Sequence, residues 1–311
     1  MRTVIAVLLA LAASLVCATT VSAQSCTSSI TPTTYGSVDL LAGSPIDTMG
    51  NISISCTGTA NTTVYACPTF AAGTGGSSGD IRFMSNGASG SVSFNLFIDS
   101  GRSQIWGGSF GSTTAPIYAV ALNGSGNGSV ASTTIYGRIY GGQSMALAGS
   151  YTSDITATTF TSATPATCSG TATAASLLVT ATYAPTCTLS TATLDFGNIT
   201  SLASAVDGQT NLTVACSNGS PYSIALDGGL SLAADPTLRR MTRSSSILLY
   251  GLYRDGGRTL PWGSTTGAGG NILGSTGTGS GQIHPVYGRV NVQSVPPPGT
   301  YTDTIVVTVT N

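Results

Sequence analysis

The side chains able to do chemistry in this chain are few, and their types favour cross-linking over catalysis. His284 is the only histidine, which excludes a histidine metal cluster and allows a Ser-His-Asp triad only around that residue. It precedes Pro285 at an expected strand entrance, where a structural role is the commoner one. The acidic side chains are all aspartates, mostly in turn sequences such as Asp99-Ser100-Gly101 and Asp255-Gly256, which does not favour the paired acids of a glycosidase. We therefore expect no enzyme, no metal and no cofactor.

The cysteines are the chemically informative residues. Seven are present, and Cys17 lies in an N-terminal stretch with Arg2, an apolar run over 4–16 and a small-residue cleavage site at Val21-Ser22-Ala23. We predict a secretory signal peptide at 1–23 and mature protein from Gln24. Six cysteines then remain, which suits an oxidising compartment. No later segment is long and apolar enough to span a membrane.

The charge balance excludes one class of partner. The 10 basic residues are all arginines and the 11 acidic residues are all aspartates, which gives a net charge of −1. Without a basic surface, we expect no nucleic acid to bind. The chain is also rich in Gly, Ser, Thr and β-branched residues, which favours short strands joined by turns over helices.

The second half of the chain repeats the first. The matching segments, in order, are Cys26 and Cys187; Tyr35-Gly36-Ser37 and Phe196-Gly197-Asn198; 51–56 and 211–216; Asp99 to Trp106 and Asp255 to Trp262; and 135–138 and 286–289. Such an ordered set indicates a duplicated domain. We predict domain 1 at 24–183, a linker at 184–186 that is stiffened by Pro185, and domain 2 at 187–311.

The repeat also predicts the disulfides. Because Cys26 corresponds to Cys187 and Cys56 to Cys216, each domain should hold one bridge, Cys26–Cys56 and Cys187–Cys216. Cys67 and Cys168 have no counterparts in domain 2 and should pair with each other. Closing a loop of about 30 residues stabilises a domain by roughly 3–4 kcal/mol in the loop-entropy account.

The two copies differ at their ends. In domain 1 the strand-like segment 151–160 is followed by a second one, 175–183, whose alternate residues Leu177, Val179, Ala181 and Tyr183 share a face. Domain 2 has the matching segment 301–310 and then Asn311. We therefore expect a β-sandwich without its final strand, with an open groove that a strand from another chain fills. The predicted groove residues are Leu248, Tyr250, Leu252, Ile305, Val307 and Val309. The alternative is a six-stranded sandwich that needs no partner.

These features resemble the spore coat protein U family in two tandem copies. The resemblance is carried by the paired cysteines, Phe196-Gly197-Asn198, Tyr253-Arg254-Asp255, the Trp-Gly pairs, Tyr-Gly-Arg and Gly299 to Asp303. Domain 1 departs from the pattern at Tyr35 and Ile98. The family includes subunits of archaic, Csu-type chaperone–usher pili, so the resemblance implies an all-β chain of two immunoglobulin-like β-sandwiches in tandem. The two-domain layout resembles that of the pilus tip adhesin.

The resemblance implies partners and a location as well. A periplasmic pilus chaperone would fill the groove first, and an adjacent pilin subunit would then donate its strand at the outer-membrane usher. Only Gln24 and Ser25 precede Cys26 in the expected mature chain, so it should accept a strand and not donate one. We therefore expect secretion through the periplasm to the pilus tip at the cell surface. A structural spore or cell coat protein is the alternative.

Adhesion should use the pole of domain 1 farthest from the linker. Similar tip adhesins grip abiotic hydrophobic surfaces through apolar loops, so the resemblance implies the same mode here, with an abiotic or host surface as the expected partner. The two expected loops are 161–170 and 68–79, and neither carries a charge before Asp80. Loop 107–115, with Phe110, is a third candidate. Loop 141–149, with Met145 and Leu147, should lie at the opposite pole. The predicted contact residues are Pro68, Phe70, Ala71, Ala72, Phe110, Ala163, Pro165 and Ala166. The alternatives are ordinary loop packing and a lectin-like site for a defined glycan.

Overall fold

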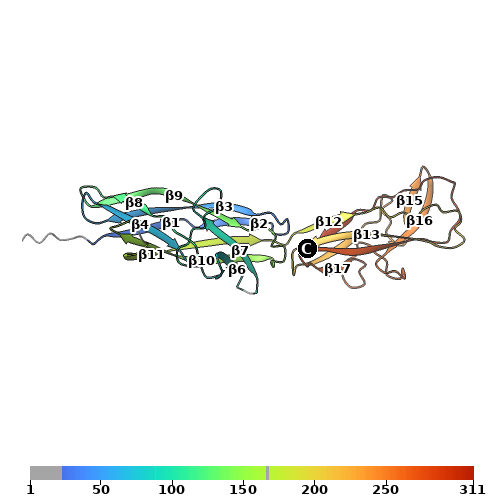
Figure 1. The fold of residues 1–311 in the computed structure, drawn as a ribbon. Helices are drawn as coiled ribbons and strands as arrows, with labels where there is room; N and C mark the ends of the chain where they lie inside the picture. The colour runs from blue at the N-terminus through green and yellow to red at the C-terminus, as the bar shows by residue number, and fades with distance from the viewer. Residues whose placement is uncertain (1–22, 88, 166–167) are drawn as a thin grey trace, which may run out of the picture.

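The computed structural model of the chain describes residues 23–87, 89–165 and 168–311. Its regular structure is all β, and the strands form two sandwiches that lie end to end (Figure 1). This is the predicted fold class. The predicted signal peptide falls on residues 1–22, which lie outside the described residues, and on Ala23.

Domain 1 is a sandwich of two antiparallel layers with one parallel edge. One layer has the order β1-β3-β9-β7-β6, and the other contains β8-β4-β10-β11-β2, with β2 parallel to β11. The pair Thr152–Ser85 joins the layers at β10 and β6. The strands are β1 (Ser25–Ile30), β2 (Thr33–Val38), β3 (Ile46–Thr57), β4 (Thr63–Phe70), β5 (Ser77–Ser78), β6 (Ile81–Ser85), β7 (Ser91–Phe97), β8 (Tyr118–Ala121), β9 (Asn127–Ile139), β10 (Gly149–Ser162) and β11 (Thr171–Tyr183).

Domain 2 repeats most of this arrangement. Its layers have the orders β12-β13-β18-β16-β15 and β17-β14-β19. The strands are β12 (Cys187–Thr191), β13 (Val206–Cys216), β14 (Pro221–Leu226), β15 (Arg239–Arg243), β16 (Ser246–Tyr253), β17 (Leu273–Thr276), β18 (Gly281–Val290) and β19 (Val307–Thr310). They match β1, β3, β4, β6, β7, β8, β9 and β10 in position, whereas β2, the two-residue β5 and β11 have no counterpart strand. Domain 2 therefore lacks its final strand.

Each domain buries one arginine and one tryptophan at equivalent places. Arg82 and Arg239 are both fully buried. Arg82 donates hydrogen bonds to the carbonyls of Phe70, Ala71 and Trp106, and Arg239 donates to the matching carbonyls of Leu226, Asp227 and Trp262. The guanidinium groups thus satisfy backbone carbonyls where β4 and β14 end and beside the two tryptophans. Sequence reasoning missed both arginines.

A second duplicated contact lies on the surface. Asp47 pairs with Arg138 at 2.7 Å and with Arg102 at 3.1 Å. Asp207 pairs with Arg289 and Arg258 at the same two distances. Hydrogen bonding to Arg138 is the main reason why the pKa of Asp47 is lowered, and Arg289 acts likewise on Asp207. The shared contacts support the duplication inferred from the sequence.

The domains meet through short loops. β11 ends at Tyr183 and β12 begins at Cys187. The Asn218 side chain donates a hydrogen bond to the Met145 carbonyl at 2.7 Å, and Leu147 and Asn218 form an isolated bridge. Loop 141–149 therefore lies at the domain junction, at the pole where the sequence placed it.

Candidate functional site

The three disulfides are those that the repeat predicted. Cys26 is bonded to Cys56, Cys187 to Cys216, and Cys67 to Cys168. The first two join each opening strand to the next strand of its layer, between directly opposed residues. The third ties β4 to the connection between β10 and β11. All six cysteines of the predicted mature chain are therefore structural in this fold.

In domain 1, β11 closes the sandwich. It runs antiparallel to β10 over 13 pairs, from Gly149–Tyr183 to Thr161–Thr171. The inward residues of both strands are fully buried: Ile155 is 0% exposed and its partner Leu177 is 1% exposed. Val179, Ala181 and Tyr183 are buried in the same way, as the alternation in the sequence predicted.

In domain 2, the equivalent positions have no strand across them. Tyr301, Ile305, Val307 and Val309 match Tyr151, Ile155, Ala157 and Thr159, yet each is only partly buried. Only Val307–Thr310 forms a regular strand there, whereas β10 extends over Gly149–Ser162. β19 is the edge of its layer and pairs with β14 alone. One side of segment 301–309 is thus unpaired, which leaves a groove.

The groove contains two hollows, and the first of them is lined mainly by apolar side chains. A cavity of about 470 Å³ runs between segment 191–196 and segment 300–307. A second hollow of about 770 Å³ continues it toward 295–301. The predicted residues Tyr250, Leu252, Ile305 and Val307 line the first hollow and Leu248 lines the second; Val309 is partly buried against the same core. Sequence reasoning missed the opposite wall of the groove, which is formed by Leu194 and Phe196. The internal repeat could have identified these residues, because they match Thr33 and Tyr35 of β2.

One polar pair lies inside this apolar groove. Asp303 lines the first hollow and accepts a hydrogen bond from the Tyr250 hydroxyl at 2.7 Å. Burial, followed by the contact with Asp303, raises the pKa of Tyr250 well above its ordinary value. The Tyr250 hydroxyl therefore stays protonated and remains a hydrogen-bond donor.

Two of the predicted surface contacts are wrong. Phe70 is 0% exposed, belongs to β4 and packs against Trp106 with the ring centroids 5.1 Å apart. Pro68 is also buried in β4, and its carbonyl accepts a hydrogen bond from the Trp106 indole. These residues form core contacts and cannot touch an external surface.

The chain after β4 also runs elsewhere than expected. β4 begins at the distal pole and leads away from it, since Tyr65 lies opposite Ser162 and Phe70 lies opposite Ala157. Ala71 and Ala72 are therefore half-buried beside the middle of β10, not at the pole. Phe110 is half-buried too, and its ring lies 4.2 Å from the Arg82 guanidinium. Loop 107–115 thus covers the buried arginine.

The distal pole itself is mainly polar. Ala163 and Pro165 are exposed there, as predicted, and Ala166 lies outside the described residues. Two adjacent turns, 58–62 and 123–127, share the pole and are joined by backbone hydrogen bonds. Their side chains are largely amides and hydroxyls, among them Thr59, Asn61, Asn123, Ser125 and Asn127.

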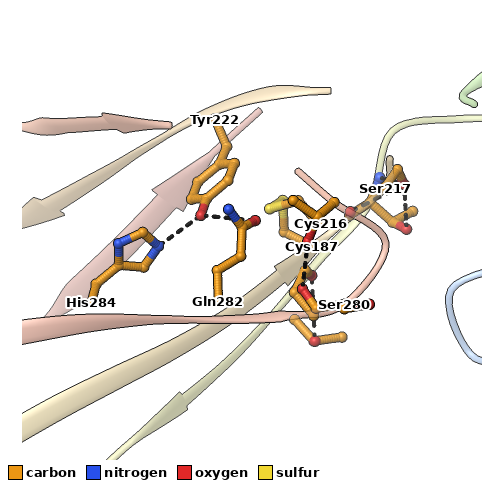
Figure 2. Close-up of a disulfide and its surroundings, with 11 residues drawn as sticks. Cys187, Cys216, Ser217, Tyr222, Ser280, Gln282 and His284 are labelled. Atoms are coloured by element: carbon orange, nitrogen blue, oxygen red, sulfur yellow. Dashed lines mark hydrogen bonds between the residues drawn. A yellow bond between two sulfur atoms is a disulfide. The ribbon is translucent and has the colours of Figure 1, made fainter. Parts of the chain in front are cut away.

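The lone histidine has a structural environment. Figure 2 shows His284 of β18 beside Tyr222 of β14, with 2.7 Å between the Tyr222 hydroxyl and His284 Nε2. The Tyr222 hydroxyl also lies 3.3 Å from the Gln282 side-chain oxygen. This contact links the two layers of domain 2. Burial lowers the pKa of His284.

Other classes of site are not found in the described part of the chain. Within residues 23–87, 89–165 and 168–311, no group of three or more His, Cys, Asp or Glu side chains could hold a metal ion. The described residues also contain no helix with the length and hydropathy that a membrane crossing needs.

Comparison with solved structures supports the two-domain fold. A chain of the CsuC–CsuE chaperone–tip adhesion subunit complex from the archaic chaperone–usher Csu pili of Acinetobacter baumannii aligns with a TM-score of 0.54 at 17% identity, covering 91% of this chain and 99% of that one. The CupB6 tip adhesin of Pseudomonas aeruginosa aligns at 9% identity over 93% of this chain and 94% of its own, with a TM-score of 0.38.

Comparison of sequences identifies the family. Protein U of Myxococcus xanthus is 39% identical over 130 residues, which span 38% of this chain and 71% of that protein. The profile of the Spore Coat Protein U domain matches residues 12–158 and again residues 173–308. Two matches that together span most of the chain fit the two structural repeats, and this chain belongs to the Spore Coat Protein U domain family.

Proposed function

We propose that this chain is the tip adhesin of an archaic chaperone–usher pilus. The observation that carries the proposal is the contrast between matched positions: Ile155 is covered by β11, whereas Ile305 has no strand across it. Filling the groove with three or four apolar side chains would contribute roughly 5–10 kcal/mol, which is comparable to the stability of a whole domain. Domain 2 therefore needs a donated strand.

The partners follow from this need. A periplasmic pilus chaperone fills the groove during secretion, and an adjacent pilin subunit replaces it at the outer-membrane usher. Domain 1 accepts no strand because its own β11 occupies the equivalent groove. A subunit with one filled and one open groove suits the end of a fibre. The chain of the CsuC–CsuE complex with a similar fold supports this position.

In this role, domain 1 attaches the cell to abiotic or host surfaces and promotes biofilm formation. The distal pole is farthest from domain 2 (Figure 1), so it reaches a surface first. Ala60, Ala163 and Pro165 are exposed apolar residues at this pole. Many fibres per cell turn weak single contacts into firm attachment.

Co-expression tests the proposal. The full chain is produced in a bacterial periplasm with and without the chaperone of a chaperone–usher system, and the soluble fraction is purified. We expect a stable one-to-one complex with the chaperone, and without it a low soluble yield of a chain whose domain 2 unfolds at a much lower temperature than domain 1. A monomeric chain with two sharp unfolding transitions and no partner contradicts the proposal.

A glycan-binding tip is the second candidate function. The amide and hydroxyl side chains of turns 58–62 and 123–127 favour it over purely apolar contact. Saturable binding to a glycan array, lost in Asn61→Ala, supports this alternative. The family match also leaves a structural coat role; a coat protein remains with the spore or cell envelope when pili are sheared off, whereas a tip adhesin leaves with the fibres.

A further inference from the structure

The groove of domain 2 carries a polar pair that the filled groove of domain 1 lacks. Asp303 takes the place of Ser153, and Tyr250 takes the place of Phe94. Ser153 and Phe94 are both 0% exposed in the closed core of domain 1. The polar pair is therefore confined to the domain that accepts a strand from elsewhere.

Asp303 has more acceptor capacity than its present partners use. One carboxylate oxygen accepts hydrogen bonds from the Leu230 amide at 2.9 Å and the Thr304 amide at 2.8 Å, and the other accepts from the Tyr250 hydroxyl. An ionised carboxylate can accept about four hydrogen bonds. None of the ion pairs found among the described residues involves Asp303. About one acceptor position of this carboxylate, which lines the first hollow, therefore remains unused by the bonds described.

The register of domain 1 shows which residue of an incoming strand would meet this carboxylate. Ser153 lies opposite Val179, and both side chains point into the core. Leu177 lies opposite Ile155, and Ala181 lies opposite Tyr151. A strand in the same register of domain 2 would place these three positions against Asp303, Ile305 and Tyr301. An apolar side chain against Asp303 would strip water from the carboxylate and return no hydrogen bond.

We propose that Asp303 selects the donor strand: the strand must present a hydrogen-bond donor such as Ser, Thr or Asn at the position that Val179 occupies in β11, with apolar residues two positions to either side. This inference rests on the proposed function. The occupant is the segment that precedes the first cysteine of a neighbouring subunit. β11 is the example on this chain, since it runs antiparallel to β10 and leads within four residues to Cys187 of the next sandwich.

A fusion to the full mature chain tests the proposal. Residue 311 follows the end of β19 and lies near the domain junction (Figure 1), where a strand antiparallel to 301–309 would have to begin. In domain 1, residues 163–170 span the equivalent connection. A copy of residues 162–183, carrying Cys168→Ser, is therefore appended after Asn311. One version keeps Val at the position of Val179 and the other carries Val179→Thr in the copy, a nearly isosteric change that adds a hydroxyl.

The readout is the thermal transition of domain 2, compared with the unfused chain. We expect the Thr copy to unfold about 3–6 °C above the Val copy, which corresponds to roughly a tenfold change in the folding equilibrium. The double variant Asp303→Ser with Tyr250→Phe restores the pair found in domain 1. In that background the Val copy should unfold at a higher temperature than the Thr copy, because Val then packs against the same Ser and Phe pair that Val179 meets in domain 1.

The outcomes separate the two proposals. If neither copy raises the transition of domain 2, the proposed function itself fails. If both copies stabilise domain 2 but Val equals or exceeds Thr against Asp303, the selection by Asp303 is refuted while the need for a strand stands. Equal preference for Thr in both backgrounds refutes it too, because the preference then does not depend on Asp303.

Discussion

Identical side chains have different surroundings in the two domains. Tyr151 and Tyr301 occupy the same position of the repeat, yet Tyr151 is fully buried and Tyr301 is not. The difference in burial comes from the neighbouring strand β11, which covers Tyr151 and has no counterpart over Tyr301, and not from the residue type. The partners of a side chain therefore decide its contribution to each domain.

The buried arginine of domain 1 is such a site. Arg82→Lys leaves carbonyls at the ends of β4 unsatisfied, because an ammonium cannot reproduce the planar fork of the guanidinium. We expect the free energy of unfolding of domain 1 to fall by about 2–4 kcal/mol. Thermal or urea unfolding measures this loss. Arg138→Lys, which alters only a surface pair, should cost less than about 1 kcal/mol.

His284 predicts a pH dependence confined to domain 2. Burial lowers its pKa in the folded state, so the unfolded state binds the proton more tightly. The contribution to stability is complete above the ordinary histidine pKa of about 6.5 and is lost as the pH falls through the folded pKa. Domain 1 contains no histidine. We expect the transition of domain 2 alone to fall between pH 7 and pH 5, and His284→Gln to abolish the fall; a parallel fall in both domains argues against this account.

At the scale of elements, β11 is the strand that separates the two domains. Val179→Asp would bury an unpaired charge against Ser153, so domain 1 should fail to fold or aggregate without a chaperone. The neighbouring Leu178 is 42% exposed on the other face of the same strand. Because Leu178 lies opposite Asp154, the control is Leu178→Asn, which adds no like charge and should leave the yield and unfolding of domain 1 nearly unchanged. If both variants fail to fold, the loss does not depend on whether the substituted side chain faces the core or the solvent.

Alternation and repetition made much of this architecture predictable. The inward face of β11 and the absence of its counterpart followed from the period of two in Leu177 and Val179 and from the internal match. Alternation and repetition did not predict where the loops lie. The disulfide of Cys67 suggested that Phe70 lies at the distal pole, but β4 runs away from that pole, so each residue after Cys67 lies farther from it. Strand direction depends on long-range pairing, which the local sequence does not specify.

At the scale of the whole molecule, the distal pole is the proposed contact surface. Ala163→Asp with Pro165→Asp places charge at two of its exposed apolar residues, so attachment to plastic per assembled pilus should fall several-fold. Met49→Asp is the control, because Met49 is exposed at 66% on β3, away from the pole. Crystal-violet staining normalised to pilus number measures attachment. Undiminished attachment by the double variant places the binding surface elsewhere.

Hydrogen–deuterium exchange tests, within one molecule, whether domain 2 needs a donated strand. Segments 150–160 and 300–310 are matched in sequence, and the first serves as the internal control for the second. In the full chain without a partner, we predict slow exchange of the amides in 150–160, which β11 covers, and fast exchange in 300–310. Adding a chaperone or a donor peptide should then slow exchange in 300–310 alone. Equal protection of both segments in the absence of any partner would contradict the account.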